Sequence, residues 1–146
     1  MANSIANNQF IQACTDSDLY NIKSLILYSS VDIHFADEAG FNCACYYGNI
    51  HVIKYLINLY KNDTIIATPI NINSDNMLGI KWACENGHLN CVKYIINLYK
   101  THACYGIICL PELYSQHWIS WKNKTIRYLH SVGYRCDKIY GIIIFL

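Results

Sequence analysis

Cysteine and histidine are the side chains of this sequence whose types and spacing could support covalent or metal chemistry. Cys84 precedes His88 by four residues, and a thiol beside an imidazole is the pairing that nucleophilic cysteine enzymes use. Cys43, Cys45 and His51 offer the sulfur and nitrogen ligands that zinc prefers. On one helix, however, Cys43 and Cys45 would point their sulfurs about 200° apart, which does not suit one tetrahedral ion. The sequence contains no Cys-x-x-Cys pair, and we expect no metal site and no cofactor.

The acidic residues give no stronger catalytic signal. Asp37 and Glu38 are adjacent in a predicted solvated loop tip, and no second acid stands in a matching position to complete a carboxylate pair for acid–base catalysis. The sequence also lacks the glycine-rich loop that grips phosphate groups. We therefore predict that the protein is not an enzyme.

The candidate residues lie on elements that the sequence repeats. The stretch 86–96 resembles the stretch 47–57, which lies 39 residues earlier. Identical residues in 40–61 and 79–100 are Gly40/Gly79, Ala44/Ala83, Cys45/Cys84, Gly48/Gly87, Lys54/Lys93, Tyr55/Tyr94, Ile57/Ile96, Asn58/Asn97, Leu59/Leu98, Tyr60/Tyr99 and Lys61/Lys100. A period in this range predicts a solenoid, in which each unit buries its faces against its neighbours.

Two further units extend the array. Phe10 and Cys14 align with Phe41 and Cys45 at an offset of 31, and 126–129 matches 92–95 at an offset of 34, which indicates a fourth, degenerate unit. We place the units of this single domain (1–146) at about 8–32, 37–61, 75–100 and 110–133, with an insertion at 62–74 and a C-terminal tail at 134–146. We interpret the insertion as a surface excursion. The apolar end of the tail either packs under the last unit or marks a truncated array.

Each unit is predicted to contain two antiparallel helices. The second helix carries an apolar stripe at the spacing of an amphipathic helix, formed in unit two by Val52, Ile53, Leu56, Ile57 and Tyr60. Lys54 and Lys93 lie on its wet side, and Tyr55, Tyr94 and Tyr128 recur beside the core positions, with packing or convex-surface roles.

The first helix is expected to be shorter, at about 42–47 and 81–86. Gly48 and Gly87 end it, since glycine adopts the left-handed conformation without steric cost. In the first unit Ser17 stands at the glycine position, and either Ser17 or Asp18 is expected to cap the second helix.

Composition narrows the class of protein. The chain has 146 residues, of which 53% are hydrophobic and 14% charged, as in a folded domain. Its net charge of +1 offers no broad basic surface, so we expect no nucleic-acid partner. We find neither a secretory signal nor an apolar run near the roughly 20 residues of a membrane span, and expect an intracellular protein without membrane contact. Cysteines that recur at one repeat position are expected to be reduced core residues.

The order Ala-Cys-x-x-Gly-[Asn/His]-[Ile/Leu]-x-[Val/Cys]-[Ile/Val]-Lys-Tyr-[Leu/Ile]-Ile at 44–57 and 83–96 resembles the ankyrin repeat. The variant Cys-Glu-Asn-Gly-His-Leu, followed by Val-Lys-Tyr, is similar to the divergent ankyrin repeats of giant amoeba-infecting viruses. The resemblance covers roughly 10–133 and implies an all-α solenoid of helix-turn-helix units, three clear and one degenerate. HEAT and armadillo arrays are alternatives that have longer first helices.

The resemblance also implies a function. It implies that His88 bonds across neighbouring turns, and that loop tips and first helices line a concave face that grips a protein partner. The residues there that vary between units are Asp37, Glu38, Asn42, Tyr46, Tyr47, Asp75, Asn76, Met77, Lys81, Trp82, Glu85 and Asn86. We expect a monomer that binds a host protein in the host cytoplasm, with the nucleus and the virion as alternatives. A degenerate or truncated fragment with a structural role or none is the competing hypothesis.

Overall fold

A computed structural model of the chain describes residues 4–62, 68–101, 124–131, 135–136 and 143–144. The first two stretches form helices joined by short turns and connections. The bounds are α1 Ser4–Thr15, α2 Leu19–Tyr28, α3 Phe35–Tyr47, α4 Ile50–Asn62, α5 Ser74–Glu85 and α6 Leu89–Thr101. Unit 1 consists of α1 and α2, unit 2 of α3 and α4, and unit 3 of α5 and α6.

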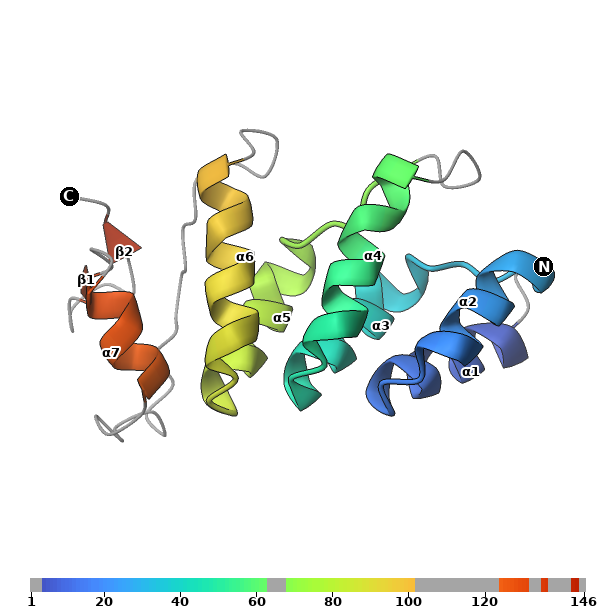
Figure 1. Ribbon diagram of the computed structural model, residues 1–146, viewed down its shortest axis with the longest axis horizontal. Coiled ribbons are helices and arrows are strands. Elements are labelled where there is room, and N and C mark those ends of the chain that lie inside the picture. The colour runs from blue at the N-terminus through green and yellow to red at the C-terminus, as the bar shows by residue number, and fades with distance from the viewer. Residues whose placement is uncertain (1–3, 63–67, 102–123, 132–134, 137–142, 145–146) are drawn as a thin grey trace.

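The helix pairs form two layers (Figure 1). The second helices α2, α4 and α6 lie side by side in one layer, and the first helices α1, α3 and α5 lie behind it. The first helices make most of the contacts between units, α1 against α3 and α3 against α5, and the two helices of each unit also pack together. This arrangement confirms the predicted all-α solenoid of helix pairs.

The apolar stripe of the second helices forms the core between the layers. The buried members are Val52, Ile53, Leu56 and Ile57 in α4 and Cys91, Val92, Ile95 and Ile96 in α6. The prediction was wrong for Tyr60, which is 49% exposed, while Leu59 is buried. Its counterpart Tyr99 is buried, with its hydroxyl donating to Oδ1 of Asn73. The residue of unit 2 that is equivalent to Asn73 is His34, and its ring forms hydrogen bonds with Glu38 and Thr68. Tyr60 therefore lacks the hydrogen bond that holds Tyr99.

Left-handed residues end the first helices, as predicted for the two glycines. Gly48 has a φ of 75° and Gly87 a φ of 72°. Ser17 takes a similar conformation in unit 1, with a φ of 61°, at a cost of roughly 1–2 kcal/mol for a residue with a Cβ atom. Asp18 rather than Ser17 caps α2, because its carboxylate accepts the backbone N–H of Asn21 at 3.0 Å.

Two glycines inside the first helices set the distance between units. A Cβ atom on Gly40 would lie 2.6 Å from Cε1 of Phe10, and one on Gly79 would lie 3.0 Å from Cε1 of Phe41. Both phenylalanines are fully buried. Each phenylalanine therefore packs against the glycine of the next unit, at a separation that any side chain at the glycine position would prevent.

The end of the predicted insertion belongs to the core of unit 3. Ile70 and Ile72 are buried, so the interpretation as a surface excursion does not hold for this part of 62–74. Asp32 accepts the N–H of His34 at 3.0 Å, and Asn71, 39 residues later, accepts the N–H of Asn73 at 3.1 Å. These matching turns extend the repeat register backwards into the connections. Residues 63–67 lie outside the described part of the chain.

The helix expected near the end of the fourth unit is α7, Lys124–Ser131, and it packs against α6. Within the predicted tail, the short strands β1 (Arg135–Cys136) and β2 (Ile143–Ile144) pair antiparallel. The predicted first half of the fourth unit, 110–123, lies outside the described residues.

Replacing Gly40 by alanine tests the close approach between units. In an ordinary helix interior, alanine is favoured over glycine by about 1 kcal/mol. Here the new methyl group would overlap the ring of Phe10. We expect Gly40→Ala to lower the free energy of unfolding by about 1–3 kcal/mol, measured by urea denaturation.

The matched control makes the same change in a Phe10→Leu background, where the smaller side chain leaves room for the methyl group. There Gly40→Ala should be neutral or stabilising. A single variant Gly40→Ala that is more stable than the unchanged protein would contradict the contact.

Candidate functional site

The predicted contact residues divide into a surface group and a buried group. Asp37, Tyr46, Tyr47, Asp75, Lys81, Trp82, Glu85 and Asn86 are exposed or partly exposed. Glu38, Asn42 and Met77 are buried. The side chain of Asn76 lies outside the described part of the structure.

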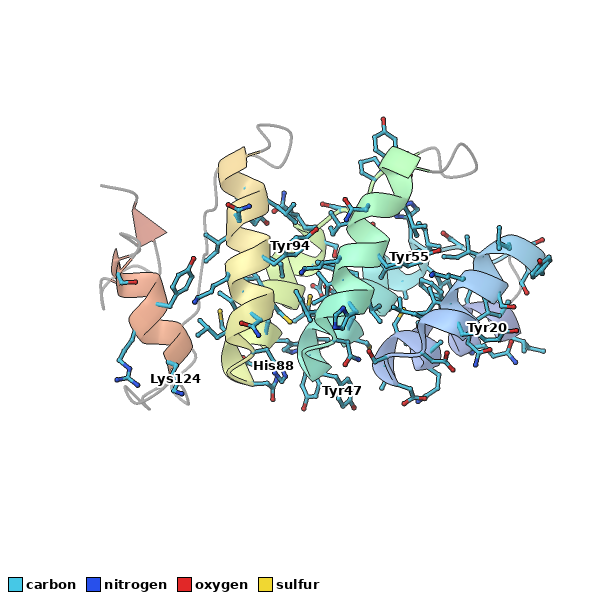
Figure 2. The ribbon with its side chains drawn as sticks, viewed as in Figure 1. Tyr20, Tyr47, Tyr55, His88, Tyr94 and Lys124 are labelled. Carbon is cyan, nitrogen blue, oxygen red and sulfur yellow. The ribbon has the colours of Figure 1, made fainter. Side chains whose placement is uncertain are left out.

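Three aromatic members of the surface group form one cluster, hereafter the aromatic cluster, across units 2 and 3. The ring of Tyr46 lies 4.9 Å from that of Tyr47 and 5.3 Å from that of Trp82, between ring centroids. Both pairs meet edge to face, at 69° and 84°, which is a favourable aromatic geometry. Tyr47 is 54% exposed, and Figure 2 shows it beside the helix-helix turns at one edge of the array. The cluster therefore combines large apolar rings with access from solvent.

Hydrogen bonds between the turns hold this cluster in place. Nε2 of His88 lies 2.8 Å from the carbonyl oxygen of Tyr46, so the ring donates from unit 3 to unit 2. This confirms the cross-turn bond predicted for His88. A Cβ atom on Gly48 would lie 2.4 Å from the His88 ring, so glycine is required there for space as well as for its positive φ. One unit earlier, the Nδ2 of Asn49 donates to two carbonyls at the end of α1, both at 2.8 Å.

The buried group corrects the prediction that these side chains face a partner. Glu38 is only 4% exposed, because α3 opens with a left-handed turn in which residues 36–38 have φ values of 52°, 52° and 64°. Met77, one period later, also has a positive φ of 64°. The turn directs these side chains inward, and the Nδ2 of Asn42 supports it by donating to the carbonyl oxygen of Asp37 at 3.0 Å. The elements α3 and α5 begin at Phe35 and Ser74 because they include these left-handed residues, and the right-handed part of α3 follows Glu38, nearer to the predicted start at about 42.

Glu38 takes part in a chain of hydrogen bonds that has the order of a catalytic triad. Its Oε1 lies 2.8 Å from Nδ1 of His34, and Nε2 of His34 lies 2.9 Å from Oγ1 of Thr68. A carboxylate, an imidazole and a hydroxyl in this order can activate a nucleophile. The same Oε1 also accepts the backbone N–H of Asn71 at 2.9 Å, which ties the start of unit 3 to α3.

Unit 1 shows that this position serves the fold. Asn7 stands where Glu38 stands in unit 2, and its buried Oδ1 accepts the N–H of Asp32, the counterpart of Asn71, at 2.9 Å. The buried acceptor therefore holds the connection to the next unit even where no triad is formed. We interpret the hydrogen bonds of His34 with Glu38 and Thr68 as an addition to this structural contact between units, and not as a catalytic group. The sequence analysis did not predict this contact between units. A visible sign of it is that Asp32 and Asn71, whose N–H groups are bound, each precede an isoleucine.

Of the cysteine and histidine candidates for catalysis, Cys84 is buried and His88 is engaged in a hydrogen bond with the backbone. Burial raises the pKa of the Cys84 thiol to about 12, and the ring of His88 is bonded to the Tyr46 carbonyl instead. Cys45 is also in the core, where burial holds its thiol pKa well above the usual value. Among the described residues, no group of three or more His, Cys, Asp or Glu side chains is placed to hold a metal ion. A thiol that keeps its proton is inert as a nucleophile or ligand.

A second set of contacts, absent from the predicted site, joins the second helices. Each lysine lies over the ring of the tyrosine that follows in the next unit: Lys23 over Tyr55 at 5.5 Å, Lys54 over Tyr94 at 5.6 Å and Lys93 over Tyr128 at 5.0 Å from the centroid. These are cation–π distances. The signal in the sequence is a basic residue followed by tyrosine at 54–55, 93–94 and 127–128.

The thiols provide a test of the burial described for the core. At pH 8 we expect iodoacetamide to modify the half-buried Cys43 well before the fully buried Cys45, as read by peptide mass spectrometry. Because the folded protein holds thiol protons that an unfolded chain releases near pH 9, the free energy of unfolding should fall as the pH rises above about 9. Equal modification of Cys43 and Cys45 in the folded chain would contradict this packing.

Within the part of the chain that the structure describes, no helix has the length and apolar character to cross a lipid bilayer.

Comparison with known proteins shows the family to which the chain belongs. Searches of the curated proteins and of the solved structures find no match. The family model of ankyrin repeats, in three copies, matches residues 10–104, a stretch that runs from the second half of α1 to the end of α6 and includes both glycine turns. The chain therefore belongs to the ankyrin-repeat family.

Proposed function

We propose that this chain is a non-enzymatic module that binds another protein through a surface centred on the aromatic cluster of Tyr46, Tyr47 and Trp82. Ankyrin repeats are generally protein-interaction modules. The observation that carries the proposal is the pair of edge-to-face contacts that gathers three large rings at the surface of two adjacent first helices.

The composition of this surface suits an interface. Tyrosine and tryptophan are the residues most often found as hot spots, because they bury a large rigid area on binding. Polar and acidic side chains flank the rings on α5 and at its end: Glu85 and Asn86 are exposed, one turn after Trp82. Apolar anchors within a polar rim are typical of protein interfaces.

The support beneath the rings favours tight binding. His88 bonds to the Tyr46 carbonyl, and the Nδ2 of Asn86 donates to the Trp82 carbonyl at 3.0 Å, so the backbone on both sides of the cluster is held before a partner arrives. A surface that is already ordered loses less conformational entropy on association. Exposed residues near the start of the first helices, Asp37 and Asp75, would extend the contact along the array.

The partner that we propose is a host protein, and the module itself a monomer inside a host cell. This part rests on the similarity of residues 84–94 to the ankyrin repeats of giant amoeba-infecting viruses. Under the competing hypothesis of a degenerate fragment, the same surface would capture nothing.

Alanine substitution of the aromatic cluster tests the proposal. The combined variant Tyr46→Ala, Tyr47→Ala and Trp82→Ala should lose the proteins that the immobilised chain captures from an amoebal lysate, as counted by quantitative mass spectrometry. Hot-spot truncations cost about 2 kcal/mol or more each, so the loss should exceed about 30-fold. Far-ultraviolet circular dichroism should stay helical.

Tyr60→Ala is the matched control, since it removes another exposed tyrosine from a different surface. It should leave capture unchanged. Capture that survives loss of the aromatic cluster would place the partner on another face, and no specific capture by any variant would favour the degenerate fragment.

A further inference from the structure

The layer of second helices presents a surface with a regular chemistry, hereafter the second-helix face. Its central row consists of Lys23, Lys54, Lys93 and Arg127, one exposed cation from each of α2, α4, α6 and α7. One turn before this row lie Tyr20, His51, Asn90 and Lys124, all of them exposed. Figure 2 shows Tyr20, Tyr55, Tyr94 and Lys124 on this layer. Within the described residues 19–28, 50–62, 89–101 and 124–131, these helices contain no aspartate or glutamate.

The net charge of +1 therefore conceals a strong separation of charge. The acidic residues that the structure describes belong to the first helices, the turns and the connections: Asp16, Asp18, Asp32, Asp37, Glu38, Asp75 and Glu85. Lys81 is the one described basic residue among them. Among the residues that the structure describes, Asp18 is the carboxylate nearest along the chain to a second helix, and it is engaged in capping α2. The expectation of no broad basic surface rested on the total charge and does not describe this face.

The cation–π contacts position the central row without neutralising it. Each lysine ammonium rests 5.0–5.6 Å from the centroid of a tyrosine ring in the next unit and remains exposed. The ring restricts the flexible lysine stem, so less side-chain entropy is lost when an anion binds. Each ammonium lies over a ring of the next second helix, so the cations recur once per unit along the row.

Apolar and aromatic groups lie on the same face as the cations. Tyr20 and Leu27 are one turn before and after Lys23 on α2 and are 81% and 58% exposed. Tyrosine is enriched at the interface between a bilayer and water, and leucine lies on the buried side of helices that bind there. Cations and apolar groups on one face therefore suit an occupant that contacts both.

We propose that the second-helix face docks on the anionic surface of a lipid bilayer, as a peripheral contact that needs no spanning helix. Anionic headgroups diffuse laterally and can therefore match a row of cations that recur once per unit, while Tyr20 and Leu27 enter the interface. A single-stranded nucleic acid fits less well, because the tyrosine rings on which bases would stack are covered by lysines. The acidic first-helix layer would face away from the bilayer and leave the aromatic cluster free.

Vesicle sedimentation of the full chain tests the proposal. We expect binding to phosphatidylcholine vesicles that contain 30% phosphatidylserine and little binding to pure phosphatidylcholine. A juxtamembrane cation contributes about 1 kcal/mol, or about fivefold in affinity. The variant Lys23→Gln, Lys54→Gln and Lys93→Gln should therefore bind about 100-fold more weakly, and binding should weaken as salt rises.

Three control variants test whether the charge of the second-helix face is the cause of vesicle binding. Lys23→Arg, Lys54→Arg and Lys93→Arg together should retain binding, since arginine keeps both the charge and the stacking on tyrosine. Lys81→Gln removes a cation from the first-helix layer and should have no effect on binding. Leu27→Ser should weaken binding to anionic vesicles without changing its dependence on salt.

Other occupants are distinguished by the same variants. Equal binding to neutral and anionic vesicles, or full binding by the glutamine variant, would overturn the proposal. Tighter binding to a fluorescent 20-base-pair DNA duplex or to a polyglutamate peptide than to the anionic vesicles, with the same dependence on the lysines, would also overturn it and assign the face to that polyanion. Failure of the vesicle experiment leaves the capture experiment on the aromatic cluster unaffected, because the two surfaces share no residue.

Discussion

The close approach of successive first helices is the constraint on which the rest of this structure depends. Phe10 fits against Gly40 and Phe41 against Gly79, so each unit is positioned by one ring of its predecessor. A solenoid is stabilised mainly by such nearest-neighbour contacts. Because the spacing is fixed there, the turns can meet through the side chain of Asn49 or His88, and a lysine on one second helix can reach the tyrosine on the next. The aromatic cluster and the basic row are both consequences of one interunit distance.

The sequence predicted those features whose cause lies within one unit. Gly48 and Gly87 could be assigned because a left-handed residue at a helix end favours glycine whatever surrounds it. The apolar stripe could be assigned because helical periodicity alone decides which side chains face the core. Tyr60 departs from its stripe because burial at that position depends on an anchor in another segment, which Tyr99 has in Asn73 and Tyr60 has not.

The features that sequence reasoning missed depend on the backbone or on the neighbouring unit. Glu38 and Met77 are variable between units and polar or flexible, which indicated a surface role, but a left-handed turn of non-glycine residues directs them inward. Of the three left-handed residues 36–38, only Asp37 is of a type that adopts this conformation readily. The turn is held by contacts such as the hydrogen bond from the N–H of Asn71 to Glu38. The burial of Ile70 and Ile72 was not predicted for a related reason. Their place in the repeat follows only from the equivalence of Asp32 and Asn71, which the matching turns of the structure establish.

The lysine and tyrosine pairs show how a repeat can serve stability and surface chemistry with the same residues. A cation–π contact at an exposed site stabilises by about 0.5–1 kcal/mol, a small amount that recurs at three successive contacts between second helices. Unit 1 differs from the later units, because Ser24 occupies the tyrosine position of α2. Tyr55, Tyr94 and Tyr128 each lie under a lysine of the preceding unit, and the three lysines are exposed as a row. A change from lysine to glutamine would weaken the contact between units only slightly, while it would remove the charge from the surface completely, so the structural and electrostatic roles of one residue can be separated.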